Sequence, residues 1–248
     1  ISVNGVAALN QTSAAINPAT VSSRWALFTF TDPVKGLQAN AANNNSSRVV
    51  VDGVGDVTAF DLGNNGSGGN QNVYTTAETI AIDANVTKND TGADAVSGIT
   101  WGRWTGGNLT VTDKVTPLAV TTIANTNTHW IAGPTTAGQV MLPVTGTFNY
   151  TWAGGTQPTD SLGNVGTLNS ASLQANFTAQ TVNMGVNATV NATNYVATGT
   201  NMPIQQGQFS NDNGGTYTAT ANGAAAQGFV GGVFTGATGN GAAVVYGF

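Results

Sequence analysis

The sequence predicts an all-β fold of antiparallel strands, and three observations support this prediction. Gly, Asn and Thr are abundant and form helices poorly, whereas Thr, Val and aromatic residues fit pleated strands. Short segments alternate apolar and polar residues: in residues 147–152, Phe148, Tyr150 and Trp152 share one face. We find no segment with the periodicity of an amphipathic helix. One packed and one wet face per strand is typical of antiparallel sheets.

We expect two regions that meet near residue 95. Residues 1–95 predict a smaller β-rich region, which contains a low-complexity loop at 63–70 and ends in the polar stretch 88–94. Residues 96–248 are more regular and predict an antiparallel β-barrel of about eight strands. Its clearest expected strands are 98–104, 108–112, 147–152, 173–177, 182–188, 228–234 and 242–248.

The first residues predict a strand without a nearby partner. Apolar or small residues alternate with their neighbours at Ile1, Val3, Gly5, Ala7 and Leu9. No tight turn follows that would fold the next segment back against them. This segment is therefore a candidate strand for donation to the sheet of another copy, through main-chain hydrogen bonds.

Charge excludes several classes of partner. Only 7% of the residues are charged and the net charge is -5, which disfavours nucleic acid and anionic membranes.

The chain contains no cysteine, so it holds no disulfide or thiolate metal site. It begins at Ile1 rather than Met, from which we expect a removed leader or a longer N-terminal region and an extracellular or outer-surface location. The sequence contains no stretch of about 20 apolar residues, which a membrane-spanning helix requires.

The sequence offers little for catalysis or for a bound cofactor. The one histidine, His129, stands beside Trp130 on an expected strand, where a structural role competes with catalysis or haem ligation. The Gly-x-Ser-x-Gly motif of serine hydrolases is missing from the sequence. We therefore expect no enzymatic activity, no catalytic residue and no cofactor.

Five aspartates raise the question of a calcium site. Asp52, Asp56 and Asp61 recur every four or five residues, and Asp90 and Asp94 fall in a polar stretch. Their spacing fits neither an EF-hand nor a calcium-binding repeat. We favour solvated turn residues over a metal site.

Large aromatic residues have two interpretations. Trp101, Trp104, Trp130, Tyr150 and Trp152 could stack on a sugar or a porphyrin, but large rings at period-two spacing are more often core. We therefore predict a barrel core, whose members are Trp101, Trp104, Phe148, Tyr150, Trp152, Phe177, Phe229, Phe234 and Tyr246.

Residues 98–248 also carry a family resemblance. Its elements are residues 101–104 (WGRW), 129–133 (HWIAG), 146–151 (GTFNYT), 173–178 (LQANFT) with 181–182, and 228–236 (GFVGGVFTG) before 241–242. In this order they resemble the C-terminal eight-stranded barrel of transferrin-binding-protein-like surface proteins of Gram-negative bacteria, including barrels that follow FecR-type domains. The resemblance implies a surface protein whose exposed loops bind a host protein, haem or a glycan.

Two classes of function follow. The first is a structural subunit of a homopolymeric surface fibre or matrix, in which copies assemble by strand addition. Low charge favours it, because neutral surfaces approach one another without desolvating ions. The second is the ligand-binding or adhesive module that the resemblance implies, in which the first strand pairs within its own subunit. We favour the fibre, with copies of the chain as its partners.

Overall fold

The fold is all-β, as the sequence predicts. The computed structural model describes residues 2–11, 18–22, 26–32, 36–42, 48–51, 57–61, 78–113, 120–133 and 139–248. Within these ranges the only helical segment is a 3-10 turn at Asn211–Asn213, and the sheets are antiparallel. The expected loop at 63–70 and residue Ile1 lie outside the described residues.

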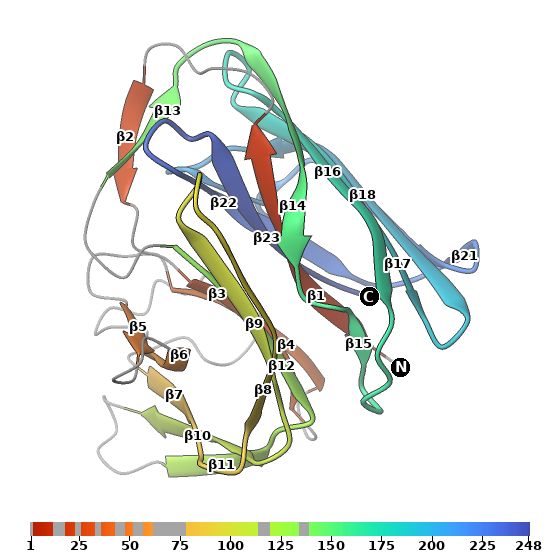
Figure 1. Cartoon of the computed structure of the whole chain (residues 1–248). Helices are drawn as coiled ribbons and strands as arrows, with labels where there is room; N and C mark the ends of the chain where they lie inside the picture. The colour runs from red at the N-terminus through yellow and green to blue at the C-terminus, as the bar shows by residue number, and fades with distance from the viewer. Residues whose placement is uncertain are drawn as a thin grey trace.

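The largest sheet curves into a half-barrel (Figure 1). Its strands, in spatial order, are β19 (Gln208–Ser210), β22 (Phe229–Thr235), β23 (Gly241–Gly247), β1 (Val3–Gln11), β14 (Thr147–Gly155), β16 (Thr167–Asn176), β17 (Thr181–Val190), β18 (Thr193–Pro203), β20 (Thr216–Ala221) and β21 (Ala224–Ala225). A short strand, β15 (Thr159–Asp160), pairs with the start of β1. The two ends of this order, β19 and β21, do not pair among the described strands, so a closed barrel of eight strands is not shown.

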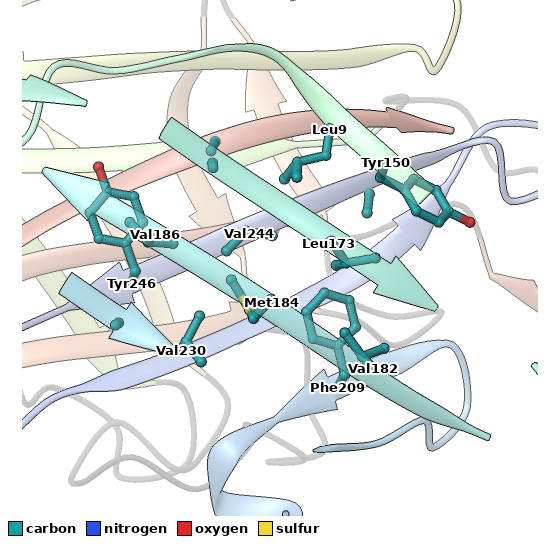
Figure 2. Packing of buried hydrophobic residues seen from close by; sticks show 14 of the residues in the cluster. Leu9, Tyr150, Leu173, Val182, Met184, Val186, Phe209, Val230, Val244 and Tyr246 are labelled. Atoms are coloured by element: carbon teal, nitrogen blue, oxygen red, sulfur yellow. The ribbon is translucent and has the colours of Figure 1, made fainter. Parts of the chain in front are cut away.

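The concave side of the half-barrel holds the main hydrophobic core. Along β17, every second residue from Val182 to Val190 is buried there, as the alternating sequence predicts. Figure 2 shows Leu9 of β1 among side chains from β14, β16, β17 and β23. Five of the predicted core aromatics lie in this cluster: Phe148, Tyr150, Phe177, Phe234 and Tyr246.

A middle sheet packs against the half-barrel, and an outer sheet packs on the other face of the middle sheet. The middle sheet contains β4 (Gly36–Ala42), β3 (Ala26–Asp32), β12 (Asn127–Ala132), β9 (Ile99–Thr105) and β8 (Thr87–Asp94). The outer sheet contains β11 (Val120–Ala124), β10 (Asn108–Asp113), β7 (Glu78–Ile82), β6 (Val57–Asp61) and β5 (Arg48–Val51). A separate ribbon pairs β13 (Gln139–Pro143) with β2 (Pro18–Ser22). The described strands thus form three layers.

The middle sheet is packed on both faces. Trp101 of β9 and Ile131 of β12 join the cluster that faces the half-barrel. Trp104 and Trp130, on the same two strands, join the cluster that faces the outer sheet, where Trp104 packs at 5.3 Å from Phe60 between ring centroids. Trp101 and Trp104, which we predicted in the barrel core, are therefore buried in these two other clusters.

The first strand joins two of the three layers. β1 lies between β23 and β14 in the half-barrel (Figure 1). Val3, Ala7 and Leu9 face the half-barrel core, whereas Val6 and Ala8 face the middle sheet. A side chain at Gly5 is excluded, because its Cβ would lie 2.6 Å from Cζ of Tyr246.

Two predicted core aromatics lie elsewhere. Burial alternates along β14 only as far as Tyr150, and Trp152 is 44% exposed. There the register between β1 and β14 shifts, because Leu9 pairs with Trp152 but Ala8 pairs with Gly154. The extra residue of β14 forms a β-bulge, which redirects the side chains around it. Phe229 is only half-buried and packs on the cluster between the half-barrel and the middle sheet.

The sheets do not divide at residue 95. β8 precedes that position and β9 follows it, yet they are neighbours in the middle sheet. β1, from the first region, lies among strands of the second. In the parts of the chain that the structure describes, no helix has the length and apolarity that a membrane crossing requires.

We predict that Leu9→Ala lowers the free energy of unfolding by about 2–5 kcal/mol, because Leu9 is fully buried and truncation leaves a cavity. Thr151→Ala, at an exposed position of the adjacent β14, should change it by less than about 0.5 kcal/mol. Urea unfolding followed by tryptophan fluorescence measures both. Equal, small effects would contradict the placement of β1 in the core.

Candidate functional site

The candidate site is β1 and the slot that it fills. β14 and β23, far apart in the sequence, both pair with β1 and are not paired with each other. Four of the five residues that we predicted for assembly, Val3, Gly5, Ala7 and Leu9, lie in β1 and are buried. In this single chain the strand is thus paired along both edges.

The hydrogen bonds fix which residues face each other most closely. Val3 and Phe248 exchange both main-chain bonds, at 3.0 and 2.8 Å from N to O. Because hydrogen-bonded and non-hydrogen-bonded pairs alternate in an antiparallel ladder, the opposed residues Ala8 and Ala243 form a non-hydrogen-bonded pair. Their side chains are therefore the closer kind of cross-strand neighbours.

Beneath β1 lies a buried polar network centred on His129. The Nδ1 and Nε2 atoms of His129 lie 2.7 Å from the hydroxyl oxygens of Thr156 and Thr159, respectively. Thr156 binds the β1 backbone: its N–H donates to Val6 O at 3.2 Å, and its hydroxyl accepts from Val6 N–H at 3.4 Å. The Thr159 hydroxyl donates to Oδ1 of Asn4 at 3.3 Å.

These contacts assign the proton on the histidine ring. A hydroxyl has one proton, and that of Thr159 is used toward Asn4. Nε2 of His129 therefore carries hydrogen and donates to Thr159, while Nδ1 accepts from Thr156. Burial, and secondly the charge of Arg103, lower the pKa of His129 from 6.5 to about 3. The ring is neutral at physiological pH.

Arg103 has its own partners in the same layer. Its Nε donates to Oδ2 of Asp90 at 2.7 Å, and its Nη1 donates to Oδ1 of Asn127 at 2.9 Å. The same Asp90 oxygen accepts from Gln157 N–H at 3.1 Å. These bonds tie β8 and β9 to the chain after β14.

The network suits structural support better than catalysis. His129 is fully buried and both of its ring nitrogens are engaged, so neither is open to a substrate or to a haem iron. Its partners are threonine hydroxyls that hold the first strand. The arrangement fixes β1 against the middle sheet.

Asp90 and Asp94 have separate partners. Asp90 pairs with Arg103, and Asp94 accepts from Ser97 N–H at 2.8 Å and from the Ser97 hydroxyl. Asp61 belongs to the outer sheet, while Asp52 and Asp56 lie outside the described residues. Within the described ranges, no group of three His, Cys, Asp or Glu side chains could hold a metal ion.

The structure brings together three of the five aromatics weighed as a stacking platform. Trp101, Trp104 and Trp130 line one cavity of about 140 Å³. Tyr150 is in the half-barrel, where its hydroxyl donates to Gly239 O at 2.7 Å, and Trp152 is on the exposed part of β14.

Local sequence patterns contain little sign of the polar network. Asn4 alternates with the apolar residues of the expected first strand, and Thr156 and Thr159 lie in no strand that we expected, yet all three are buried. The one signal in the sequence is that His129 stands beside Trp130 on an expected strand, because a histidine that is buried there requires polar partners.

No protein-family model, no curated protein and no solved structure matches this chain. The resemblance to transferrin-binding-protein-like barrels therefore stays a prediction.

We predict that acidification weakens the fold through His129. Below pH 6.5 the unfolded chain binds a proton that the native chain refuses until about pH 3, so stability is lost as pH falls through this window. Between pH 7 and pH 5 the loss should be about 2 kcal/mol. In His129→Gln, which does not titrate, urea unfolding should show little change over this range. A similar loss in both proteins would contradict this role.

Proposed function

We propose that the protein is a non-enzymatic structural subunit that assembles with copies of itself by exchange of β1. The observation that carries the proposal is the position of this strand. The first strand of the sequence fills a slot between two later strands, which keep unpaired edges without it. A strand in such a slot can equally come from another copy.

The contacts of β1 do not depend on which chain supplies the strand. Its ladders to β14 and β23, its apolar contacts on both faces and its bonds through Asn4 would recur between two copies. Closed and exchanged forms therefore differ little in contact energy, and protein concentration shifts the balance toward assembly.

The surface of the half-barrel suits close approach of like subunits. From residue 115 onward the only charged side chains are Asp160 and Asp212. On the convex face, Nδ2 of Asn169 donates to Oδ1 of Asn187 at 2.8 Å, and Nδ2 of Asn194 donates to the same oxygen at 2.8 Å. Such a neutral amide surface brings no like charges together and favours an extracellular matrix whose assembly tolerates changes of salt concentration.

The test uses single cysteines, because the chain has none of its own. We predict that chains carrying Ala8→Cys, unfolded and refolded together with chains carrying Ala243→Cys, form disulfide-linked pairs. These positions face each other as a non-hydrogen-bonded pair, at a spacing that suits a disulfide, and in the mixture a disulfide between different variants requires exchange of β1. Non-reducing gels and intact mass measure the linked species.

The matched control mixes Ala243→Cys with Val233→Cys. Val233 also faces Ala243, but it lies on β22, which directly precedes β23 in the chain and has no need of exchange. This mixture should stay unlinked. Equal linkage in both mixtures, or monomers alone in the first, would overturn strand exchange. Monomers alone are what the alternative function expects, a surface module that binds a host protein, haem or a glycan.

A further inference from the structure

The first strand contains a dipeptide that is chemically reactive in a flexible chain, Asn4–Gly5. The backbone nitrogen that follows an asparagine can attack the side-chain amide carbon, and glycine hinders this attack least because it has no side chain. The same two residues select the register of β1, since Asn4 accepts from Thr159 and Gly5 leaves room for the Tyr246 ring. A covalent change at this dipeptide would therefore alter the part of β1 that determines its position.

The reaction is deamidation. The Gly5 nitrogen loses its proton and bonds to Cγ of Asn4, while Nδ2 leaves as ammonia and a five-membered succinimide ring forms. Water then opens the ring at one of its two carbonyl carbons. One product is aspartate, and the other is isoaspartate, whose main chain runs through the former side-chain carbonyl and contains one extra methylene group.

In its slot, β1 holds the Asn4 amide at both of its polar atoms. Oδ1 accepts from the Thr159 hydroxyl at 3.3 Å, and Nδ2 donates to the Thr29 hydroxyl at 3.4 Å. Asn4 is only 2% exposed, which keeps water, the second reactant, away from its side chain. The seated strand thus fixes the group that would be attacked.

The attacking nitrogen is engaged as well. Val3 and Phe248 form a hydrogen-bonded pair, and such pairs alternate along an antiparallel ladder. The opposed residues Gly5 and Tyr246, two positions further along, are therefore a hydrogen-bonded pair too, in which Gly5 N–H donates to the Tyr246 carbonyl oxygen. The nitrogen cannot turn toward the Asn4 side chain unless this bond breaks and the strand leaves its extended conformation.

We propose that Asn4 is a site of spontaneous deamidation, which reacts while β1 is out of its slot and is protected once β1 is seated. The chemistry rests on the fold alone. The biological consequence rests on the proposed function, because exchange between copies requires that β1 is released.

Either product would prevent correct seating of β1. Aspartate would place a carboxylate at a position that is 2% exposed, and a buried charge costs far more than a buried amide that has partners. Isoaspartate would lengthen the main chain between Val3 and Val6, so the two parts of β1 could not both keep their partners in β23. Deamidation therefore limits the time for which a released strand remains competent for assembly.

The experiment compares two Asn-Gly pairs in the full chain. Asn213–Gly214 is the internal control, because Asn213 is exposed and lies in the 3-10 turn outside β1. Native protein and protein unfolded in guanidinium chloride are incubated at mildly alkaline pH, and peptide mass spectrometry follows the replacement of NH₂ by OH at each site. In the unfolded chain, both sites should react at similar rates. In the native protein, Asn4 should react at least about a hundredfold more slowly and Asn213 should slow much less, since only Asn4 requires opening of a core strand.

Two variants test whether the seat of β1 provides the protection. Leu9→Ala makes opening of β1 easier and should raise the native rate at Asn4 about tenfold or more. Thr151→Ala, exposed on the adjacent β14, should leave this rate unchanged. Similar rates at Asn4 in native and unfolded protein, or a native rate that ignores Leu9→Ala, would overturn the proposal.

The consequence is tested with Asn4→Asp, which supplies the aspartate product directly. When Asn4→Asp is added to the chain with Ala8→Cys, its disulfide linkage to the Ala243→Cys chain should fall about tenfold, whereas Asn213→Asp should leave linkage unchanged. Equal linkage with both variants would contradict the loss of seating. Absence of linkage even without these variants would instead contradict the exchange of β1, and the deamidation rates would stand independently of it.

Discussion

The fold depends on a strand that is packed on both faces and paired along both edges. β1 supplies Leu9 to the half-barrel core and Val6 to the cluster against the middle sheet. Its ladders connect β14 with β23, the two halves of the half-barrel order. These contacts join segments far apart in the sequence, so forming them costs loop-closure entropy. The half-barrel is a continuous sheet only when β1 is in place.

The buried polar network makes this placement specific. Apolar contacts have no preferred direction, so they define the position of β1 along its neighbours less sharply than hydrogen bonds do. The hydrogen bonds from His129 through Thr156 and Thr159 to Val6 and Asn4 form at only one position of β1 along its neighbours. They suit a neutral histidine, because a charged ring would need solvation that this layer does not provide.

Sequence patterns predicted the local structure well and the partners of each strand poorly. The alternation through Phe148 and Tyr150 is confirmed, because period-two burial depends only on neighbouring residues. Trp152 was misplaced, since the bulge beside it arises from pairing with β1. Trp104 was expected in the barrel core, because a large ring on a strand shows that it is buried but not in which layer. The slot of β1 and the network below it depend on long-range pairing, which no local pattern contains.

Register is the property that any form of this protein must preserve, whichever chain supplies β1. A slip of one residue would turn Asn4 from Thr159 toward the apolar half-barrel core, where an amide has no partner. The same slip would move Gly5 away from Tyr246 and place a side chain against its ring. Asn4 and Gly5, on opposite faces of β1, thus both favour the same register: Asn4 because its amide needs a partner, and Gly5 because its position excludes a Cβ. In an exchanged strand, Asn4 and Gly5 would select the same register. Pairing between copies would therefore be as specific as pairing within the single chain.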